Sequence, residues 1–412
     1  MDFNTKVLHG RSTGNYAFNS TLPPITQVTA FGYGSAEEQE KVFNHKAFGY
    51  AYTRIGNPTI SAFENRIAEL EGAPSAVATA SGMSAVTLSL LNVLSSGDEI
   101  IASSGLYGGT LDLFKDLEKF GIHTHFTRKL TPKYIEPFIN DHTRIIFGEV
   151  ISNPGLFILD IPELAEFAHS RGLPLIVDST TATPYLINPL SLGADIVVHS
   201  SSKYINGSGN SISGIIVDGS SFNWDPSRYP AMKDFAKYGS MAYSIRLRTD
   251  IWENFGACLS PFNAYMNIVG LETLGLRMER ICSNARELAR GLSTVKSISD
   301  VNHPTLESCE SYYLAQRDLG GFGGGILTFR AGNRSRAFHI MDKLKYATIA
   351  SNIGDIRTLV INPASTLYIH STKEQMADAG VFDDTIRVSV GIEDPKDLLE
   401  DFVQAIELTD KE

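Results

Sequence analysis

A short motif suited to binding an anion follows one of the apolar runs of this chain. The run Ala76–Ala80 leads into Ser81, Gly82 and Met83, which stand where a helical pattern begins. Free backbone N–H groups at a helix N-terminus, the positive end of the helix dipole and a residue without a side chain can together hold a phosphate. A Ser-Gly pair is also an ordinary N-cap, so the motif alone does not decide between these roles.

Lysine, hydroxyl and carboxylate groups follow two other apolar runs. The apolar run Ile196–His199 is followed directly by a segment that contains Ser200, Ser202 and Lys203. The preceding apolar run, 173–177, is followed directly by Asp178. A lone lysine is usually a surface charge, and a carboxylate at a strand end usually caps a turn. Ser200 and Ser202 are alternate residues, however, and can direct both hydroxyls at one phosphate. Because ligands of open α/β sheets bind at the carboxyl ends of the strands, we expect these groups to converge beside the anion motif.

This set of groups has a specific chemical use. Pyridoxal 5′-phosphate needs a lysine for its Schiff base, a carboxylate that keeps its ring nitrogen protonated, and a helix N-terminus with hydroxyls for its phosphate. The residues therefore indicate an enzyme that binds this cofactor. No CxxC spacing typical of a zinc site occurs, and no metal is expected.

The elements that must position these residues alternate between strands and helices. Continuous apolar runs, separated by helical patterns at 83–94, 110–120 and 162–171, predict an α/β fold with a mostly parallel sheet covered on both faces. A further helix is expected from Thr59 to Gly72. The predicted strands are 76–80, 99–102, 123–127, 144–149, 173–177, 196–199 and 214–217.

The pattern divides the chain into three parts. Residues 1–55 carry little periodicity and many turn formers, which is typical of an arm that lies on the body or on a neighbouring subunit. Residues 56–250 hold the predicted sheet and its polar motifs. Residues 251–412 begin with one long helical pattern at 260–292 and continue as a smaller α+β unit. Its expected strands and helices are near 325–330, 358–361, 386–390, 335–344 and 395–408.

The composition excludes several classes of function. The 412 residues include 35 Lys plus Arg and 46 Asp plus Glu, a formal net charge of −11, so no nucleic acid and no membrane surface is expected as a partner. Hydrophobic residues make up 43%, as in globular proteins, and no apolar stretch reaches the roughly 20 residues that span a bilayer. The three cysteines and the lack of a signal-like N-terminal segment predict a cytoplasmic protein.

Motifs spread along the chain resemble those of one known family. They are AYTRIGNPT, ASGMSA, LYGGT, EVISNP, HSSSKYINGSG, ASNIGD and IRVSVGIED. With them the chain is similar, from about Thr5 to the last helix, to the Cys/Met-metabolism family of pyridoxal-phosphate enzymes. The resemblance implies fold type I, with a mostly parallel seven-stranded sheet in the large domain and a smaller C-terminal α+β domain. It also implies a homotetramer with shared active sites.

The same resemblance implies roles toward the cofactor. Lys203 matches the Schiff-base lysine, Asp178 the partner of the ring nitrogen, Tyr107 the aromatic ring that stacks on the pyridine, and Asn153 the residue that bonds the phenolic oxygen. The residues implied for the phosphate are Ser81, Gly82, Met83, Ser200 and Ser202.

Other residues are implied to bind substrate or to reach a neighbouring subunit. Tyr52 and Arg54 match residues that reach the cofactor phosphate of the neighbour, and Tyr52 is also expected at the substrate. Ser351 and Arg387 match the groups that hold the substrate α-carboxylate, a task for which the planar guanidinium fork is suited. Lys203 is then the expected general base for the Cα proton.

Details of the motifs favour γ-replacement. The stretches that begin at Ser260 and Ala350, and the insertion 218–238, resemble the branch that joins sulfide or a thiol to O-acetyl-L-homoserine. Its products are homocysteine or methionine, and acetate. Gly109 stands where methionine γ-lyases usually carry a cysteine.

Departures from the family pattern keep an alternative open. The segments 178–181, 207–209 and 365–370 differ from the usual Asp-Asn-Thr-Phe, Gly-His-Gly and threonine-rich runs, and they flank the expected site. A methionine γ-lyase or a related γ-elimination or γ-replacement enzyme is therefore the alternative. A dinucleotide-binding oxidoreductase is disfavoured, because no GxGxxG motif opens a helix.

Overall fold

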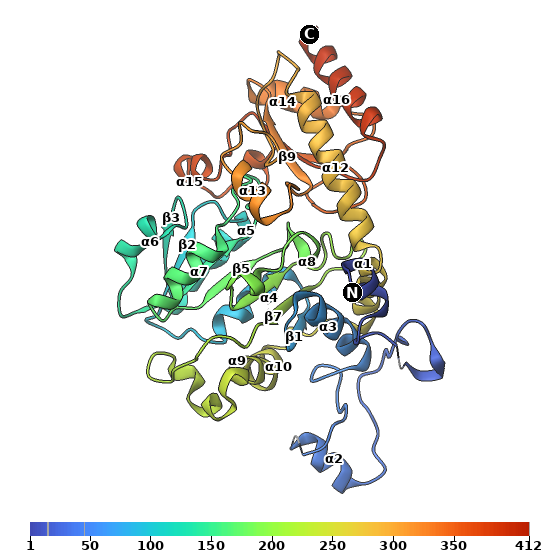
Figure 1. The fold of residues 1–412 in the computed structure, drawn as a ribbon, viewed down its shortest axis with the longest axis vertical. Helices are drawn as coiled ribbons and strands as arrows, with labels where there is room; N and C mark the ends of the chain where they lie inside the picture. Colours follow the sequence, from blue (N-terminus) through green and yellow to red (C-terminus); the bar gives the residue numbers. More distant parts are fainter. Residues whose placement is uncertain (15, 45, 412) are drawn as a thin grey trace.

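The chain folds around two sheets, which the computed structural model shows over residues 1–14, 16–44 and 46–411 (Figure 1). A seven-stranded sheet lies in the larger unit, and a five-stranded sheet lies in the smaller unit toward the C-terminus. The helix α12 (Leu274–Leu292) runs from the larger unit up along the smaller one. The α/β class predicted from the sequence, with a seven-stranded sheet and a smaller C-terminal unit, is confirmed.

The large sheet has the strand order β1-β7-β6-β5-β4-β2-β3. The pairs from β6 to β3 are parallel, whereas β7 runs antiparallel to both β1 and β6. Parallel strands covered on both faces read as continuous apolar runs, which is why the sequence predicts them well. The strands are β1 (Ser75–Thr79), β2 (Glu99–Ser103), β3 (His123–Thr127), β4 (Thr143–Glu149), β5 (Leu175–Asp178), β6 (Ile196–His199) and β7 (Gly214–Asp218).

Helices bury both faces of this sheet. Successive residues of a strand point to opposite faces, so Ile146 of β4 belongs to one hydrophobic cluster while Ile145 and Phe147 belong to another. One cluster includes α3 (Pro58–Glu71), α7 (Ile161–Ser170) and α11 (Pro261–Leu271). The other includes α4 (Gly82–Leu91), α5 (Gly108–Leu117) and α9 (Ala242–Arg246).

Capping residues fix where the helices near the site begin and end. Asn57 caps α3 by accepting from Thr59 N, Pro58 occupies the first turn, and Gly72 ends the helix in the left-handed region with φ 71°. Ser81 caps α4, because its hydroxyl accepts from Ser84 N. The start of α4 therefore lies directly after β1.

The smaller unit is a mixed sheet with helices packed on it. Its order is β10-β11-β12-β9-β8, in which only β10 and β11 run parallel. Its helices α12, α14 and α16 share one hydrophobic cluster with the sheet. The elements are β8 (Ser299–Asn302), α13 (Tyr312–Asp318), β9 (Ile326–Arg330), α14 (Arg334–Asp342), β10 (Thr348–Ile349), β11 (Leu359–Ile361), α15 (Lys373–Asp378), β12 (Thr385–Ser389) and α16 (Pro395–Asp410).

The single long helix predicted over 260–292 is wrong, because the segment forms two helices, α11 and α12. Thr273 leaves helical geometry at φ −111° and ψ 9°. The guanidinium of Arg277 donates to the carbonyl oxygen of Gly270 at 2.6 Å, and thereby satisfies a carbonyl at the end of α11. The apolar pattern continues through the break, so periodicity could not show it.

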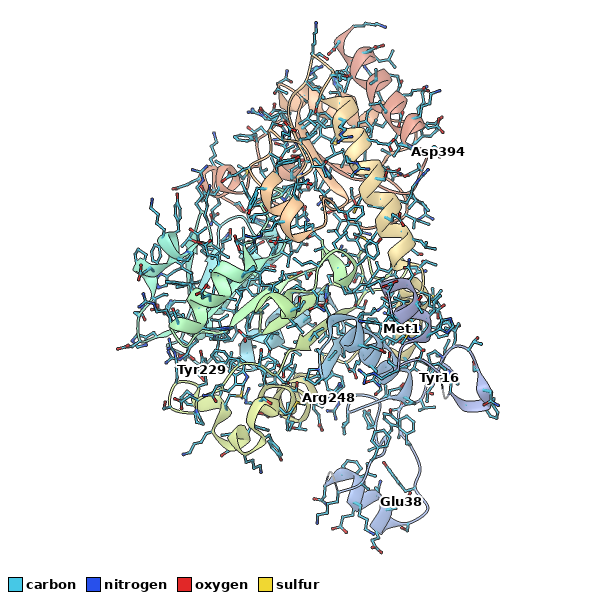
Figure 2. All side chains as sticks on the ribbon, viewed as in Figure 1. Met1, Tyr16, Glu38, Tyr229, Arg248 and Asp394 are labelled. Atoms are coloured by element: carbon cyan, nitrogen blue, oxygen red, sulfur yellow. The ribbon has the colours of Figure 1, made fainter. Side chains whose placement is uncertain are left out.

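The N-terminal residues form an arm that is only partly seated on the body. The helix α1 (Phe3–His9) packs on α3 and α12, and Glu69 accepts from the backbone N–H groups of Arg11 and Ser12. Beyond this, α2 (Ala36–Phe43) projects away from the rest of the chain, as the position of Glu38 in Figure 2 shows. Phe18 and Phe48 on the arm are 99% and 91% exposed.

Short helices connect the larger elements. They include the α-helices α6 (Pro132–Ile135), α8 (Thr183–Leu186) and α10 (Glu253–Phe255), and a π-helix at Leu247–Trp252. The 3₁₀ helices are Ala17–Asn19, Glu118–Phe120, Glu136–Phe138, Pro189–Leu192, Pro230–Met241 and Pro363–Ser365. Within the described part of the chain, none of the helices combines the length and the apolar character needed to cross a bilayer.

Candidate active site

A cavity of about 230 Å³ opens at the carboxyl end of the large sheet and is closed by segments of the smaller unit. It brings together residues that lie as far apart in the chain as Ser81 and Arg387. The predicted site residues that line it are Ser81, Gly82, Met83, Tyr107, Asn153, Asp178, Ser200, Ser202, Lys203, Ser351 and Arg387.

The start of α4 forms one wall of the cavity. Gly82 lies so close to the β6 loop that an added Cβ would be 2.5 Å from Cβ of Ser200. Only glycine therefore allows the helix N-terminus, with its positive dipole end, to approach the serine loop. This cradle has the size and polarity for a phosphate.

The two predicted hydroxyls have different surroundings. Ser202 Oγ donates to Ser213 O at 3.0 Å and accepts from Ser213 N at 2.8 Å. The backbone N–H of Ser200 donates to Thr180 Oγ1 at 2.8 Å, and its side chain faces Gly82 across the cradle. Both serines line the cavity, but the Ser202 hydroxyl is already engaged by backbone.

The amine of Lys203 lies inside the cavity. Its Nζ donates to Asn352 Oδ1 at 2.6 Å. Burial, and then the positive charge of Arg387, lower the pKa of the Lys203 amine to about 8. A lysine with such a pKa is partly neutral near pH 7 to 8, as a nucleophile or general base must be.

Two carboxylates face each other at the ends of neighbouring strands, because Glu149 of β4 pairs in register with Asp178 of β5. Glu149 accepts from the backbone N–H of Tyr107 at 2.7 Å and of Asn153 at 3.2 Å, and Asp178 accepts from Thr180 N at 2.8 Å. Burial and the neighbouring Asp178 raise the pKa of Glu149 to about 8, and burial raises the pKa of Asp178. This pair would be stabilised by a cationic partner such as a protonated ring nitrogen.

Arg387 supplies a buried positive charge on the opposite side. It lies in β12 and is 1% exposed, and burial lowers its pKa to about 10. Its Nη1 donates to Asn153 Oδ1 at 3.3 Å and its Nη2 to Asn352 O at 2.8 Å. Among the described residues no carboxylate pairs with it, and its Nε has no partner. A buried guanidinium without a counter-ion fits the carboxylate of a substrate.

Tyr107 stands at the mouth of the cavity, at the start of α5. Its side chain is 37% exposed, and burial of its hydroxyl raises its pKa. A Cβ at Gly109 would be 2.6 Å from Cε1 of Tyr107, so a side chain there would displace the ring. The glycine thus allows the present position of the tyrosine.

Tyr52 and Arg54 do not line the cavity of the described chain. Arg54 Nη1 donates to Glu253 O at 3.0 Å, and its guanidinium lies 5.5 Å from the centroid of the Tyr52 ring. The role predicted for them, at the cofactor of a neighbouring subunit, stays a prediction.

Glu149, Thr180 and Asn352 are among the polar residues of the cavity that sequence reasoning missed. A signal existed for the first two. Glu149 ends a predicted strand just as Asp178 does, and Thr180 stands two residues after Asp178. Asn352 follows the predicted Ser351 directly, but only the folded chain places its side chain on Lys203.

The residues present fit pyridoxal 5′-phosphate. The cradle at Gly82 matches its phosphate, the Asp178 and Glu149 pair matches a protonated ring nitrogen, and Lys203 is a partly neutral amine between them.

Comparison with known proteins agrees with this fit. The model of a family described as Cys/Met metabolism PLP-dependent enzyme matches residues 4–407. The O-acetyl-L-homoserine sulfhydrylase of Leptospira meyeri is 38% identical, with 98% of this chain and 96% of that protein covered. The homocysteine synthase of Schizosaccharomyces pombe is also 38% identical, with 98% of each chain covered.

Two solved structures are similar over the whole chain. A structure of an O-acetylhomoserine (thiol)-lyase from Campylobacter jejuni, which contains N′-pyridoxyl-lysine-5′-monophosphate, has a TM-score of 0.94 and 34% identity, covering 99% of this chain and all of that one. A cystathionine γ-synthase from Xanthomonas oryzae, in complex with aminoacrylate and cysteine, has a TM-score of 0.87 and 28% identity, covering 100% of this chain and 99% of that one.

Proposed function

This chain belongs to the Cys/Met-metabolism family of PLP-dependent enzymes, and on that premise we propose that it catalyses γ-replacement on O-acetyl-L-homoserine. Sulfide or a thiol replaces the acetyl ester, which gives homocysteine or methionine and releases acetate. The sulfhydrylases and homocysteine synthase among its relatives support this choice. The observation that carries the proposal is the buried guanidinium of Arg387, which has no carboxylate partner among the described residues and lines the same cavity as Lys203.

Each wall of the cavity has a binding role in this proposal. Asp178 would hold the protonated ring nitrogen of the cofactor, Tyr107 would bind its ring and Asn153 its phenolic oxygen. The phosphate would be held by Ser81, Gly82, Met83, Ser200 and Ser202.

The substrate is held and deprotonated by groups of both units. When bound, the cofactor supplies an electron sink for the charge left when protons leave carbon. Arg387 and Ser351 hold the substrate α-carboxylate, so that the Cα hydrogen faces Lys203 Nζ. The pKa of Lys203, lowered to about 8, lets the neutral amine take that proton and return it later.

Product analysis tests the proposed reaction. We expect homocysteine and acetate from O-acetyl-L-homoserine with sulfide, and only slow formation of 2-oxobutanoate without sulfide. Equally fast release of 2-oxobutanoate and methanethiol from L-methionine alone would show a γ-lyase instead. Lys203→Ala should abolish turnover and the yellow colour of the lysine-bound cofactor, whereas replacement of an exposed lysine that does not line the cavity, in Lys237→Ala, should change neither.

The proposal extends to the assembly and the place of action. The arm 1–55, the cofactor-binding domain 56–250 and the domain 251–412 form one subunit of a homotetramer in the cytoplasm. The arm carries Tyr52 and Arg54 to the active site of a neighbour, and its exposed Phe18 and Phe48 support such a contact. The three cysteines are free thiols, which suits a reducing compartment.

Mixed subunits test the shared site. Arg54→Ala is expected to be poorly active and Lys203→Ala inactive, and a mixture that has exchanged subunits should regain part of the activity through hybrid sites. Proven exchange without any recovery would place Arg54 outside the site.

A further inference from the structure

We propose that Asn352 is a positioning residue that holds the free ε-amine of Lys203 and ties it to the arginine that faces the substrate carboxylate. The inference rests on the proposed role of Lys203 as the proton-transferring amine. It does not depend on which γ-substituent leaves.

The contacts of Asn352 join two charged groups. Its side-chain Oδ1 accepts from Lys203 Nζ at 2.6 Å, and its backbone carbonyl oxygen accepts from Arg387 Nη2 at 2.8 Å. One residue therefore bridges the amine on the β6 loop of the large unit and the guanidinium on β12 of the small unit. The side-chain amide of Asn352 serves the amine, and its backbone carbonyl serves the guanidinium.

The backbone around Asn352 is fixed by both units. Gly354 N donates to Ser389 Oγ of β12 at 3.0 Å, and Ile356 N donates to Gly207 O at 2.9 Å. Gly354 has φ +73°, and an added Cβ would lie 2.5 Å from Tyr204 N. The segment thus lies directly against the peptide that follows Lys203, so the backbone next to Asn352 is held beside the lysine.

An amide is the chemically suitable partner for a base at this position. Its carbonyl oxygen accepts a hydrogen bond from a neutral amine without competing for the proton, so the nitrogen lone pair is directed elsewhere. A carboxylate would instead stabilise the ammonium form. The other titratable groups that line the cavity around Lys203 are Arg387 of β12, Asp178 of β5, Glu149 of β4 and Tyr107 at the start of α5.

Two substitutions with opposite expected signs test the inference on the cofactor-free enzyme. The fraction of Lys203 that reacts with trace acetic anhydride is measured by peptide mass spectrometry between pH 6 and pH 11. Asn352→Asp should move the titration midpoint of Lys203 up by at least about one pH unit, because a charged partner favours the ammonium. Asn352→Leu should move it down, because the ammonium loses an acceptor.

The control variant adds a carboxylate elsewhere. Asn333→Asp keeps a good N-cap on α14, where the side chain accepts from Arg336 N, and should leave the midpoint of Lys203 unchanged. Identical midpoints in wild type, Asn352→Asp and Asn352→Leu, with unfolding temperatures preserved, would overturn the inference.

A second readout uses the cofactor-loaded enzyme and an amino acid without a γ-leaving group. Exchange of the Cα hydrogen of L-norvaline with deuterated solvent, followed by NMR, reports proton transfer by Lys203 alone. Asn352→Leu should lower kcat of exchange at least 10-fold with KM within about threefold of wild type. A raised KM at unchanged kcat would mean that Asn352 serves carboxylate binding only. Neither readout requires O-acetyl-L-homoserine to be the substrate, so failure of the proposed function would be seen separately.

Discussion

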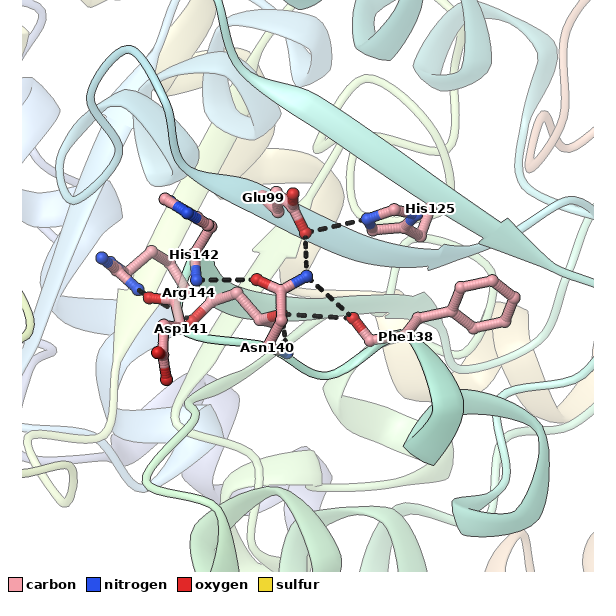
Figure 3. A network of polar contacts seen from close by, with 8 residues as sticks. Glu99, His125, Phe138, Asn140, Asp141, His142 and Arg144 are labelled. Atoms are coloured by element: carbon pink, nitrogen blue, oxygen red, sulfur yellow. Dashed lines mark hydrogen bonds and ion pairs between the residues drawn. The ribbon is translucent and has the colours of Figure 1, made fainter.

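The two ends of the large sheet both carry acidic side chains, but their surroundings differ. At the amino end, Glu99 begins β2, and its Oε2 accepts from Asn140 Nδ2 at 2.7 Å and lies 2.8 Å from His125 Nε2 (Figure 3). At the carboxyl end, Glu149 and Asp178 lie side by side without a cationic side chain as an ion-pair partner among the described residues. Glu99 thus has a histidine and an amide beside it, whereas Glu149 has a second carboxylate beside it.

The pKa values follow this difference. The pKa of Glu99 is lowered, because the effect of burial, which by itself raises it, is outweighed by the hydrogen bonds from Asn140 and His125. For Glu149, burial and Asp178 act in the same direction and raise the pKa to about 8. A cationic ligand would stabilise the Glu149–Asp178 pair but is not needed by Glu99. The raised pKa values therefore distinguish the candidate binding site from the structural hydrogen-bond network around Glu99.

The arginines show the same contrast. Arg144, near the start of β4, lies 3.0 Å from Asp98, whereas Arg387 has no such partner among the described residues. Four substitutions test whether the charged residues at the two ends differ in function.

The largest effect is expected for Asp178→Asn. An amide cannot keep a ring nitrogen protonated, so kcat/KM should fall by at least about 1,000-fold, which corresponds to about 4 kcal/mol of transition-state stabilisation. The unfolding temperature of the cofactor-free variant should not fall, because repulsion with Glu149 is removed. Steady-state kinetics and calorimetry measure both. Loss of stability together with activity would make Asp178 a structural residue like Glu99.

Arg387→Lys should have the next largest effect. A lysine lacks the planar fork that holds a carboxylate, so KM for the amino-acid substrate should rise by about 100-fold. Arg144→Lys at the amino end is the matched control and should leave KM unchanged. Equal KM values in both variants would remove Arg387 from the carboxylate site.

Glu149→Gln should change the pH dependence of stability. The folded-state pKa of Glu149, about 8, is above the ordinary value, so the folded state binds a proton more strongly and wild-type stability falls as pH rises from about 4.5 to 8. The variant should lose this decline in the cofactor-free form. We also expect an activity loss of about 10-fold, because Gln offers one acceptor oxygen for the N–H groups of Tyr107 and Asn153. A decline unchanged in the variant would assign it to another group.

Glu99→Gln should have the smallest effect. The lowered pKa of Glu99 contributes stability that is present above the ordinary pKa and is lost as pH falls through the lowered one. Denaturant titrations should show a loss of about 1 kcal/mol at pH 7, with a weaker acid dependence and unchanged kcat/KM. An activity loss comparable to that of Glu149→Gln would erase the distinction between the two ends.

The sequence was informative where local patterns determine the structure. Asp178 and Lys203 follow continuous apolar runs. Because sites lie at the carboxyl ends of parallel strands, the sequence alone predicts that these two residues lie close together. The cap at Ser81 and the helix behind it are equally local.

Contacts between distant segments could not be predicted in this way. Asn352 meets Lys203 across 149 residues of chain, and Arg387 meets Asn153 across 234. The sequence predicted Glu149 at the end of a strand. The hydrogen bonds that it accepts from two backbone N–H groups, however, depend on the conformation of loops that are distant or irregular in the sequence. The break at Thr273 depends likewise on the side chain of Arg277, which no periodicity encodes.

The narrow approach of Gly82 to Ser200 has a consequence for how this chain can diverge. An added Cβ at position 82 would lie 2.5 Å from Cβ and 3.0 Å from Cα of Ser200, so any residue other than glycine at position 82 clashes with the serine loop. Leu367 and Ile212 also line the cavity and are apolar. Relatives that act on other substrates are therefore expected to keep glycine at position 82 and to differ at positions such as 212 and 367.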